Sequence, residues 1–213
     1  MIKGVIFDMD GLMFDTERVY GRYWREVSRE LGYPMQDDMV AYMCGATRDF
    51  QVGKFVEWFG EDVPADDIIN ICHERTHAHI ASHPIPIKPG LIELLAALRE
   101  RGIPAVIATG TRRAWADKKL ARSGVASYFD GMVCGDEVSA CKPDPEIFLK
   151  AAALIGVPPQ DCAVLEDSLN GIVAADAAGA QPIMIPDCVQ PTDEIRALCA
   201  HVLTRLDEVI ALL

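Results

Sequence analysis

The sequence lacks a long hydrophobic run, a net positive charge and a Cys-x-x-Cys pair. No stretch approaches the roughly 20 apolar residues of a membrane-spanning helix, and Asp8 and Asp10 interrupt the first apolar run too early for a signal peptide. The net charge of -12 argues against nucleic acid and against an anionic membrane as partners, since both bind a basic face. The seven cysteines are odd in number and include no Cys-x-x-Cys pair, which is typical of reduced thiols, so we expect a cytoplasmic protein.

From residue 90 onward, amphipathic helical segments alternate with short apolar segments. Each predicted helix is followed by a glycine, which favours the left-handed conformation that ends helices. Strands are predicted at residues 5–7, 103–109, 131–134, 162–165, 182–185 and 201–204, and a closing helix is predicted at 206–213. Alternating helices and buried strands predict an α/β fold with a doubly wound parallel sheet that is covered on both faces.

Residues 16–84 do not follow this alternation. Apolar residues recur at helical spacing from Val19 to Leu31, and further helices are predicted around 36–43, 48–59 and 65–81 without a convincing strand. The segment 83–90 is rich in proline and predicts a stiff return linker. We therefore expect a core made of residues 1–15 and 85–213, with an inserted helical domain at 16–84 and a hinge between them.

Two carboxylates, Asp8 and Asp10, follow the first predicted strand. Alternate residues of a strand point to the same side, so the two side chains are expected to lie together. At about 5 Å and an effective dielectric of about 20, they repel by roughly 3 kcal/mol. A fold offsets such a repulsion with a cation, or keeps one group protonated for chemistry. The alternative is an ordinary acidic loop that ends in a glycine turn.

Polar side chains also follow the next strands, at residues 109–111 (Thr-Gly-Thr), at Lys142 and at residues 166–168 (Glu-Asp-Ser). Each segment alone has an ordinary interpretation: the threonines or the serine as helix caps, and the lysine as an exposed loop residue. Ligands of open parallel sheets bind beyond the carboxyl ends of the strands, where all of these segments are expected to meet. Together they predict one site at that edge.

This arrangement resembles the haloacid dehalogenase-like (HAD) superfamily along essentially the whole chain, and its β-phosphoglucomutase-like and phosphoglycolate phosphatase-like branch in particular. The residues that carry the resemblance are Asp8, Asp10, Gly11, Asp15, Thr16, Thr109, Lys142, Pro143, Glu166, Asp167, Ser168 and Gly171. The resemblance implies a Rossmann-like HAD core with a helical cap at residues 16–84. It also implies a Mg²⁺-dependent phosphatase that hydrolyses a small phosphorylated metabolite, for example a sugar phosphate, through an aspartyl-phosphate.

The resemblance also implies the catalytic roles. Asp8 is expected to be the nucleophile, and Asp10 the acid that protonates the leaving oxygen and then the base that activates water. Lys142 is expected to neutralise charge shared with the phosphoryl oxygens, and Thr109 to donate a hydrogen bond to them.

The metal ligands implied are the Asp8 side chain, the Asp10 backbone carbonyl and Asp167, with Glu166 binding directly or through water. Such oxygen ligands suit Mg²⁺. The expected substrate-binding residues are Gly11, Gly110, Thr47 and Arg48.

The inserted domain leaves several alternatives open. Arg48 suits a distal anionic group of the substrate, but Thr47 could equally be a helix cap with Arg48 solvated beside it. Arg112 and Arg113 are candidates for the pocket rim or a solvated helix start. His73 and His77 could share a helix face and bind a metal, although a surface role fits their sequence context better.

Two other functions compete with phosphatase activity. A β-phosphoglucomutase-like phosphomutase is an alternative, but Tyr20 stands where such mutases carry a histidine on the first cap helix, which favours hydrolysis. A non-catalytic binding module is disfavoured because every group that the chemistry needs is present. The sequence does not fix the oligomeric state, and a monomer is compatible with it.

Overall fold

The computed structural model of the chain describes residues 1–43, 46 and 48–213. They form two compact units, one made of Met1–Asp15 and Ile85–Leu213 and the other of Thr16–Pro84. The first unit contains every strand of the described chain, whereas the second is helical.

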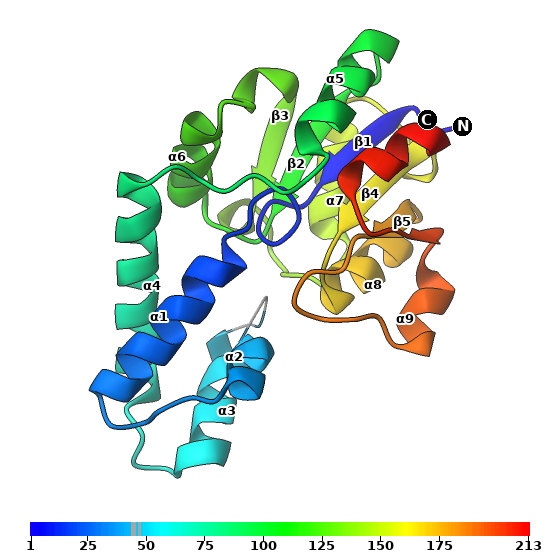
Figure 1. Cartoon of the computed structure of the whole chain (residues 1–213). Coiled ribbons are helices and arrows are strands. Elements are labelled where there is room, and N and C mark those ends of the chain that lie inside the picture. Colours follow the sequence, from blue (N-terminus) through cyan, green and yellow to red (C-terminus); the bar gives the residue numbers. More distant parts are fainter. Residues whose placement is uncertain (44–45, 47) are drawn as a thin grey trace. The chain divides into compact units, whose positions relative to one another are not determined.

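The first unit is built around a six-stranded sheet with the order β3-β2-β1-β4-β5-β6, in which every neighbouring pair is parallel. Its strands are β1 (Gly4–Phe7), β2 (Ala105–Thr109), β3 (Gly131–Cys134), β4 (Cys162–Glu166), β5 (Gln181–Met184) and β6 (His201–Val202). The first strand of the chain lies in the middle, between β2 and β4 (Figure 1). The predicted doubly wound α/β fold is confirmed.

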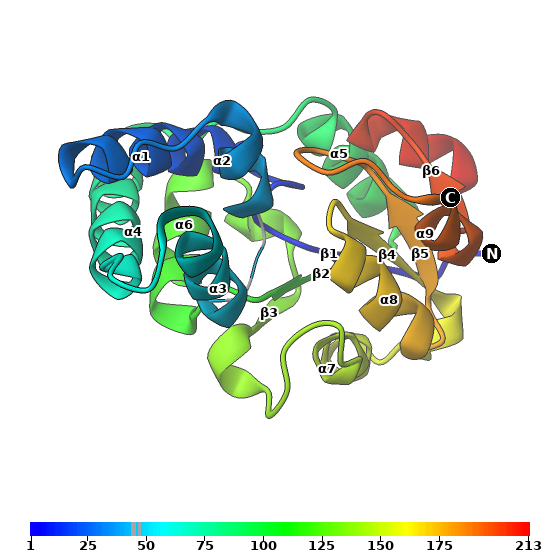
Figure 2. The same cartoon turned by 90° about the horizontal axis from the view of Figure 1, so that it is seen from below.

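Helices cover both faces of this sheet. Figure 2 shows α5 (Leu91–Arg101) and the C-terminal segment on one face, with α7 (Glu146–Leu154) and α8 (Leu169–Ala177) on the other. The buried Ile6 of β1 packs into a core with Phe148 of α7 and Ala174 of α8. The remaining helices of this unit are α6 (Arg113–Ser123), α9 (Asp193–Leu198), and the short 3₁₀ helices η1 (Ala126–Tyr128), η2 (Gly135–Glu137) and η3 (Pro159–Asp161).

The end of the chain differs from the prediction. The last strand spans only His201–Val202, and the predicted closing α-helix is the 3₁₀ helix η4 (Leu206–Leu212). Leu206 and Val209 are its buried residues, and this spacing of three matches the three residues per turn of a 3₁₀ helix. The apolar pattern identified a helical segment but did not distinguish the two helix types.

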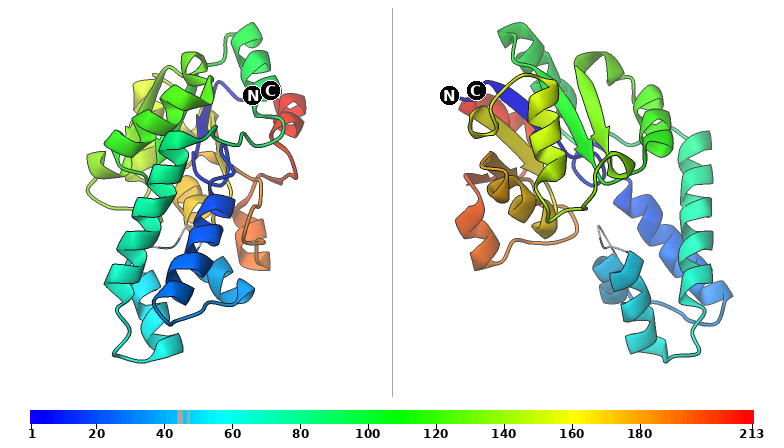
Figure 3. Two further views of the ribbon diagram at one scale, coloured as in Figure 1. Left: turned by 60° about the vertical axis from the view of Figure 1, so that its left-hand side comes forward. Right: turned by 180° about the vertical axis from the view of Figure 1, so that it is seen from behind.

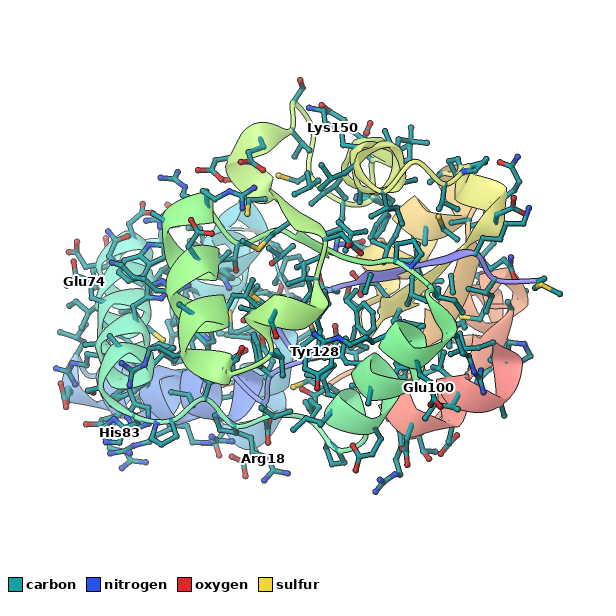
Figure 4. The ribbon with its side chains drawn as sticks, turned by 90° about the horizontal axis from the view of Figure 1, so that it is seen from above. Arg18, Glu74, His83, Glu100, Tyr128 and Lys150 are labelled. Atoms are coloured by element: carbon teal, nitrogen blue, oxygen red, sulfur yellow. The ribbon has the colours of Figure 1, made fainter. Side chains whose placement is uncertain are left out.

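The helical unit consists of α1 (Glu17–Glu30), α2 (Asp37–Met43), α3 (Arg48–Phe59) and α4 (Ala65–Ser82). The two long helices α1 and α4 lie side by side in both views of Figure 3. Trp24, Phe55 and Cys72 are buried in its own hydrophobic core. Charged side chains such as Glu74 of α4, and Glu100 and Lys150 in the other unit, project away from their helices (Figure 4). Within the described residues, no helix is both long and apolar enough for a membrane span.

The two chain segments that connect the units run antiparallel within the first unit. Phe14 pairs with Ile87, Asp15 N donates to Pro86 O at 2.9 Å, and Lys88 N donates to Met13 O at 2.9 Å. Lys88 also forms an ion pair with Asp187, with 2.6 Å between Nζ and Oδ1. The outgoing and returning segments are therefore fastened to each other by backbone hydrogen bonds.

Candidate active site

The polar residues predicted to meet do so at the carboxyl edge of the sheet. Lys142 is the centre of the cluster, because its Nζ lies 2.6 Å from Asp8 Oδ1 and 2.6 Å from Glu166 Oε1. Nζ also donates to the backbone oxygen of Ala108 at 3.3 Å. Asp8 follows β1, Glu166 ends β4, and Lys142 comes from the loop after β3, so three strands deliver the three charges.

Burial and charge together shift the pKa of Asp8 and of Lys142. Burial raises the pKa of Asp8 to about 7; Lys142 opposes this shift, and the neighbouring carboxylates Glu166 and Asp10 reinforce it. Burial alone lowers the pKa of Lys142, but the two carboxylates in contact with it outweigh that effect and raise its pKa above the ordinary value. Lys142 is therefore a permanent cation in this cluster.

Glu166 has both carboxylate oxygens engaged. Oε1 accepts from Lys142, while Oε2 accepts from Asp167 N at 2.9 Å, Ser168 N at 2.8 Å and Ser168 Oγ at 2.8 Å. The side chain is only 1% exposed. A Cβ at Gly171 would overlap its carboxylate, which explains the glycine there. Both oxygens therefore already accept hydrogen bonds, and Glu166 anchors Lys142. Its predicted contact with the metal, direct or through water, stays a prediction.

Ser168 has the capping role that its sequence also allowed. It is the N-cap of α8, and its Oγ accepts from Gly171 N at 3.1 Å. The same hydroxyl donates to Glu166, so one side chain both begins the helix and orients the buried carboxylate. Ser168 therefore both caps α8 and belongs to the polar cluster at the edge of the sheet.

Asp10 has its own cation, which sequence reasoning missed. Its Oδ2 accepts from Thr111 Oγ1 at 2.7 Å, and its Oδ1 lies 2.5 Å from Nζ of Lys119. Lys119 is only 2% exposed although it belongs to α6. It lies three residues after the buried Ala116 and four residues before the buried Ser123, on the same face of α6. The sequence of the helix carries no local signal that singles this lysine out.

Thr109 ends β2, and Gly110 begins the loop that follows it. Thr109 is 1% exposed, and its Oγ1 accepts from Thr111 N at 3.1 Å, which leaves its hydroxyl hydrogen available for another acceptor. Gly135 N donates to Thr111 O at 3.1 Å, and a Cβ at Gly135 would overlap Gly110 O. Neither threonine caps α6, whose N-cap is the next residue of the chain, Arg112.

Gly11 brings the first loop against Asp167. Its φ of 85° lies in the left-handed region, and a Cβ at this position would overlap the Asp167 carboxylate. Its N–H donates to Phe14 O at 3.0 Å. The predicted role of Gly11 in binding a substrate stays a prediction. Glycine is required here for the close approach of the two loops.

The cluster suits a divalent cation. Four carboxylates, those of Asp8, Asp10, Glu166 and Asp167, share it with two ammonium groups, so its formal charge is minus two. No group of three or more His, Cys, Asp or Glu side chains among the described residues is arranged as a metal cage. Mg²⁺ accepts a small set of protein ligands, such as two carboxylates and a backbone carbonyl, because water and substrate oxygens fill its other positions.

The predicted residues of the helical unit form a different set. Nε and Nη2 of Arg48 donate to Asp66 Oδ1 at 3.1 and 2.6 Å, and Nη1 donates to Asn70 at 3.0 Å, so this guanidinium already has an anionic partner. Thr47 lies outside the described residues. The rings of His73 and His77 have centroids 6.2 Å apart, and both contact the edge of Tyr20. The substrate role of Arg48 stays a prediction.

Arg113, considered for the pocket rim, fastens α6 to the loop after β3. Its Nε and Nη2 bind the two oxygens of Glu137 at 2.9 and 2.7 Å, and Nη2 also donates to Met132 O at 2.7 Å. This bidentate pair raises the pKa of Arg113. Arg113 therefore has a structural role at the start of α6, and its place at the pocket rim stays a prediction.

Most of this chain is similar in sequence to known proteins. The model of the haloacid dehalogenase-like hydrolases matches residues 2–179. The phosphorylated carbohydrates phosphatase of Thermotoga maritima is 32% identical, over 85% of this chain and 84% of its own length. The beta-phosphoglucomutase of Bacillus subtilis is 30% identical, over 84% of this chain and 80% of its own length.

A similar solved structure is that of CbbY from Rhodobacter sphaeroides, a D10N mutant in complex with xylulose-(1,5)bisphosphate. The two structures superpose with a TM-score of 0.78 at 26% identity, over 98% of this chain and 96% of the other. The two sequence relatives match 84% and 85% of this chain, and the solved structure matches 98% of it. The chain therefore belongs to the haloacid dehalogenase-like hydrolase family.

Proposed function

We propose that the protein is a Mg²⁺-dependent phosphatase that hydrolyses a small phosphorylated metabolite of the sugar phosphate class through an aspartyl-phosphate on Asp8. The observation that carries the proposal is the buried carboxylate of Asp8, which is held at 2.6 Å by a lysine that Glu166 anchors from the other side. A fixed carboxylate beside a fixed cation is suited to attack phosphorus, because the cation lowers the repulsion between the carboxylate and the phosphoryl oxygens.

In the first step, an oxygen of Asp8 forms a bond to phosphorus while the bond from phosphorus to the leaving oxygen breaks. Asp10 gives its proton to that leaving oxygen, which departs as an alcohol. Lys142 and the hydroxyl of Thr109 are the donors that stabilise the phosphoryl oxygens. In the second step, Asp10 takes a proton from water as the water oxygen attacks phosphorus, and Asp8 is released as a carboxylate.

The residues that would hold Mg²⁺ are Asp8, Asp167 and the backbone carbonyl of Asp10. The bound ion would supply positive charge at the nucleophile and at the phosphoryl oxygens. In this proposal the helical unit, Thr16–Pro84, serves as the cap domain. The named relatives support a sugar phosphate as the substrate class, since one is a phosphatase of phosphorylated carbohydrates and another a beta-phosphoglucomutase.

The phosphomutase is the second candidate, and the Bacillus subtilis relative favours it. Tyr20 argues for hydrolysis, because a phenol is a much weaker base than an imidazole near neutral pH. Product analysis separates the two functions. Free phosphate forms in proportion to substrate consumed with a phosphatase, whereas an isomeric sugar phosphate accumulates with a mutase that has been primed by a bisphosphate.

The proposed function is tested with a panel of sugar phosphates, nucleotides and phosphoglycolate, assayed for phosphate release with Mg²⁺ and with EDTA. We expect the highest kcat/KM for a sugar phosphate and loss of activity with EDTA, restored by excess Mg²⁺. Absence of turnover across the panel, or full activity with EDTA, contradicts the proposal.

The pKa of Asp8 gives a prediction about metal binding. Because the pKa is about 7 in the metal-free protein, Asp8 carries a proton below that pH and a negative charge above it. A proton and Mg²⁺ compete for the carboxylate, so the apparent Kd for Mg²⁺ should rise about tenfold for each pH unit below 7 and level off above it. Calorimetric titration between pH 5.5 and 8 measures this. An Asp8→Asn variant should lose most of the pH dependence, and a Kd that does not change with pH contradicts the prediction.

A further inference from the structure

Lys119 is a buried charge that the mechanism so far leaves without a role. Its side chain is 2% exposed, it lies on α6 among buried residues, and its Nζ has one ion pair among the described residues, with Asp10 Oδ1. Lysine is among the residues least often buried, unless a charged partner compensates it. The fold thus keeps a buried cation whose partner is the residue proposed to move the proton.

Lys119 and Thr111, two partners of Asp10, differ in the hydrogen bonds that they can form. An ammonium group only donates hydrogen bonds, so it can hold Oδ1 only as an acceptor. The hydroxyl of Thr111, which contacts Oδ2 at 2.7 Å, can donate to a carboxylate and can also accept from a carboxylic acid. A proton on the Asp10 carboxyl group is therefore compatible with Oδ2 and incompatible with the Oδ1 oxygen that faces Lys119.

We propose that Lys119 is the positioning residue of Asp10, which fixes Oδ1 and thereby assigns the transferred proton to Oδ2. The inference rests on the proposed phosphatase function and deepens it. Each of the two aspartates after β1 then has its own buried lysine: Lys142 serves Asp8 and Lys119 serves Asp10.

With the proton on Oδ2, each bond broken in the reaction is matched by a bond formed. In the first step the O–H bond at Oδ2 breaks, its proton goes to the leaving oxygen, and the electron pair of that bond stays on Asp10, which becomes a carboxylate. In the second step a proton of the attacking water forms a new O–H bond at Oδ2. Lys119 keeps its three protons throughout and holds Oδ1 in both steps.

The test compares Lys119→Met with Lys118→Met, a control on the same helix whose ammonium lies 4.3 Å from the ring centroid of Trp115. Two probes are used: p-nitrophenyl phosphate, whose leaving group needs little acid assistance, and the sugar phosphate with the highest kcat/KM in the panel. For Lys119→Met we expect kcat on the sugar phosphate to fall by about 30- to 100-fold, with KM nearly unchanged and less than about threefold loss on p-nitrophenyl phosphate. Lys118→Met should leave both probes unaffected.

A double-mutant cycle with Asp10→Asn distinguishes positioning from a general structural role. If Lys119 acts through Asp10, adding Lys119→Met to Asp10→Asn should change kcat on the sugar phosphate by less than about threefold. Equal losses on the two probes, or losses that multiply in the double variant, overturn the inference. Should Lys119→Met alone not fold, the double variant removes both charges of the pair, and its comparison with Asp10→Asn decides alone.

Failure of this inference and failure of the proposed function are separable. The wild-type panel and the Asp8→Asn variant address whether phosphoryl transfer occurs at Asp8 at all. The leaving-group comparison addresses only how Asp10 is held. A wild-type enzyme that releases phosphate, together with a Lys119→Met variant that is equally impaired on both probes, keeps the function and removes the role of Lys119.

Discussion

Replacing Asp8 with asparagine is expected to lower kcat for phosphate release by at least roughly 10⁴-fold, because an amide cannot form the phosphoenzyme. The substitution keeps the shape of the side chain, and Lys142 retains Glu166 as a partner at 2.6 Å, so the local fold should persist. At saturating Mg²⁺ the effect is expected mainly in kcat, because the amide removes the nucleophile. This is the largest single effect that the site geometry predicts.

The measurement has two parts, the steady-state rate and the trapping of the phosphoenzyme by a beryllofluoride mimic. Fluorine NMR should detect the trifluoroberyllate adduct in the wild type and not in Asp8→Asn. Asp10→Asn is the informative comparison, since it retains the nucleophile and should still form the adduct. Full phosphatase activity in Asp8→Asn would end the aspartyl-phosphate mechanism.

Replacing Lys142 with methionine should affect both the rate and the stability. The ammonium is the direct partner of two buried carboxylates, so its removal leaves Asp8 and Glu166 facing each other without a counter-charge. Breaking a buried ion pair by removing one partner costs roughly 3–5 kcal/mol of unfolding free energy. The loss of an oriented donor to the phosphoryl group lowers kcat by roughly 10³-fold.

Urea denaturation and phosphate release measure these two effects. Lys150→Met is the matched control, because Lys150 is an exposed residue on α7 that pairs with Glu146 at the surface. It should leave the rate and the stability close to those of the wild type. Excess Mg²⁺ should restore part of the stability lost in Lys142→Met, because a divalent cation compensates the same carboxylates. A Lys142→Met variant as active as the control is the result that contradicts the assignment.

The sequence was sufficient to predict the parallel sheet and the polar segments that follow its strands. The strand at Gly131–Cys134 was correctly located despite its weak apolar pattern, because the glycines and helices around it fixed the alternation. Lys142 could be placed near Asp8 from chain order alone, since the ends of parallel strands meet at one edge. These inferences depend on the local apolar pattern and on the order of the strands along the chain, and both can be read from the sequence.

Lys119 and Glu166 show what the sequence could not state. Nothing local distinguishes Lys119 from Lys118 as the buried one, because that depends on how α6 is rotated against the sheet. Glu166 was expected to bind the metal directly or through water, and only the fold shows that its two oxygens accept hydrogen bonds from Lys142 and from the turn that begins α8. Lys119 is paired with Asp10, which is distant in the sequence. Glu166 is paired with the distant Lys142 and with backbone amides of its own turn. Neither set of partners is visible in the local sequence.

The antiparallel pairing of the two connecting segments makes the helical insertion a module. Asp15 and Pro86 are hydrogen-bonded to each other although 70 residues of chain separate them. For the sheet, the insertion is therefore a loop whose two ends are joined. The entropy of closing a loop grows only with the logarithm of its length, so lengthening, shortening or exchanging this segment changes the stability of the sheet little. A chain built this way can exchange one contiguous stretch while the strands of its sheet keep their register.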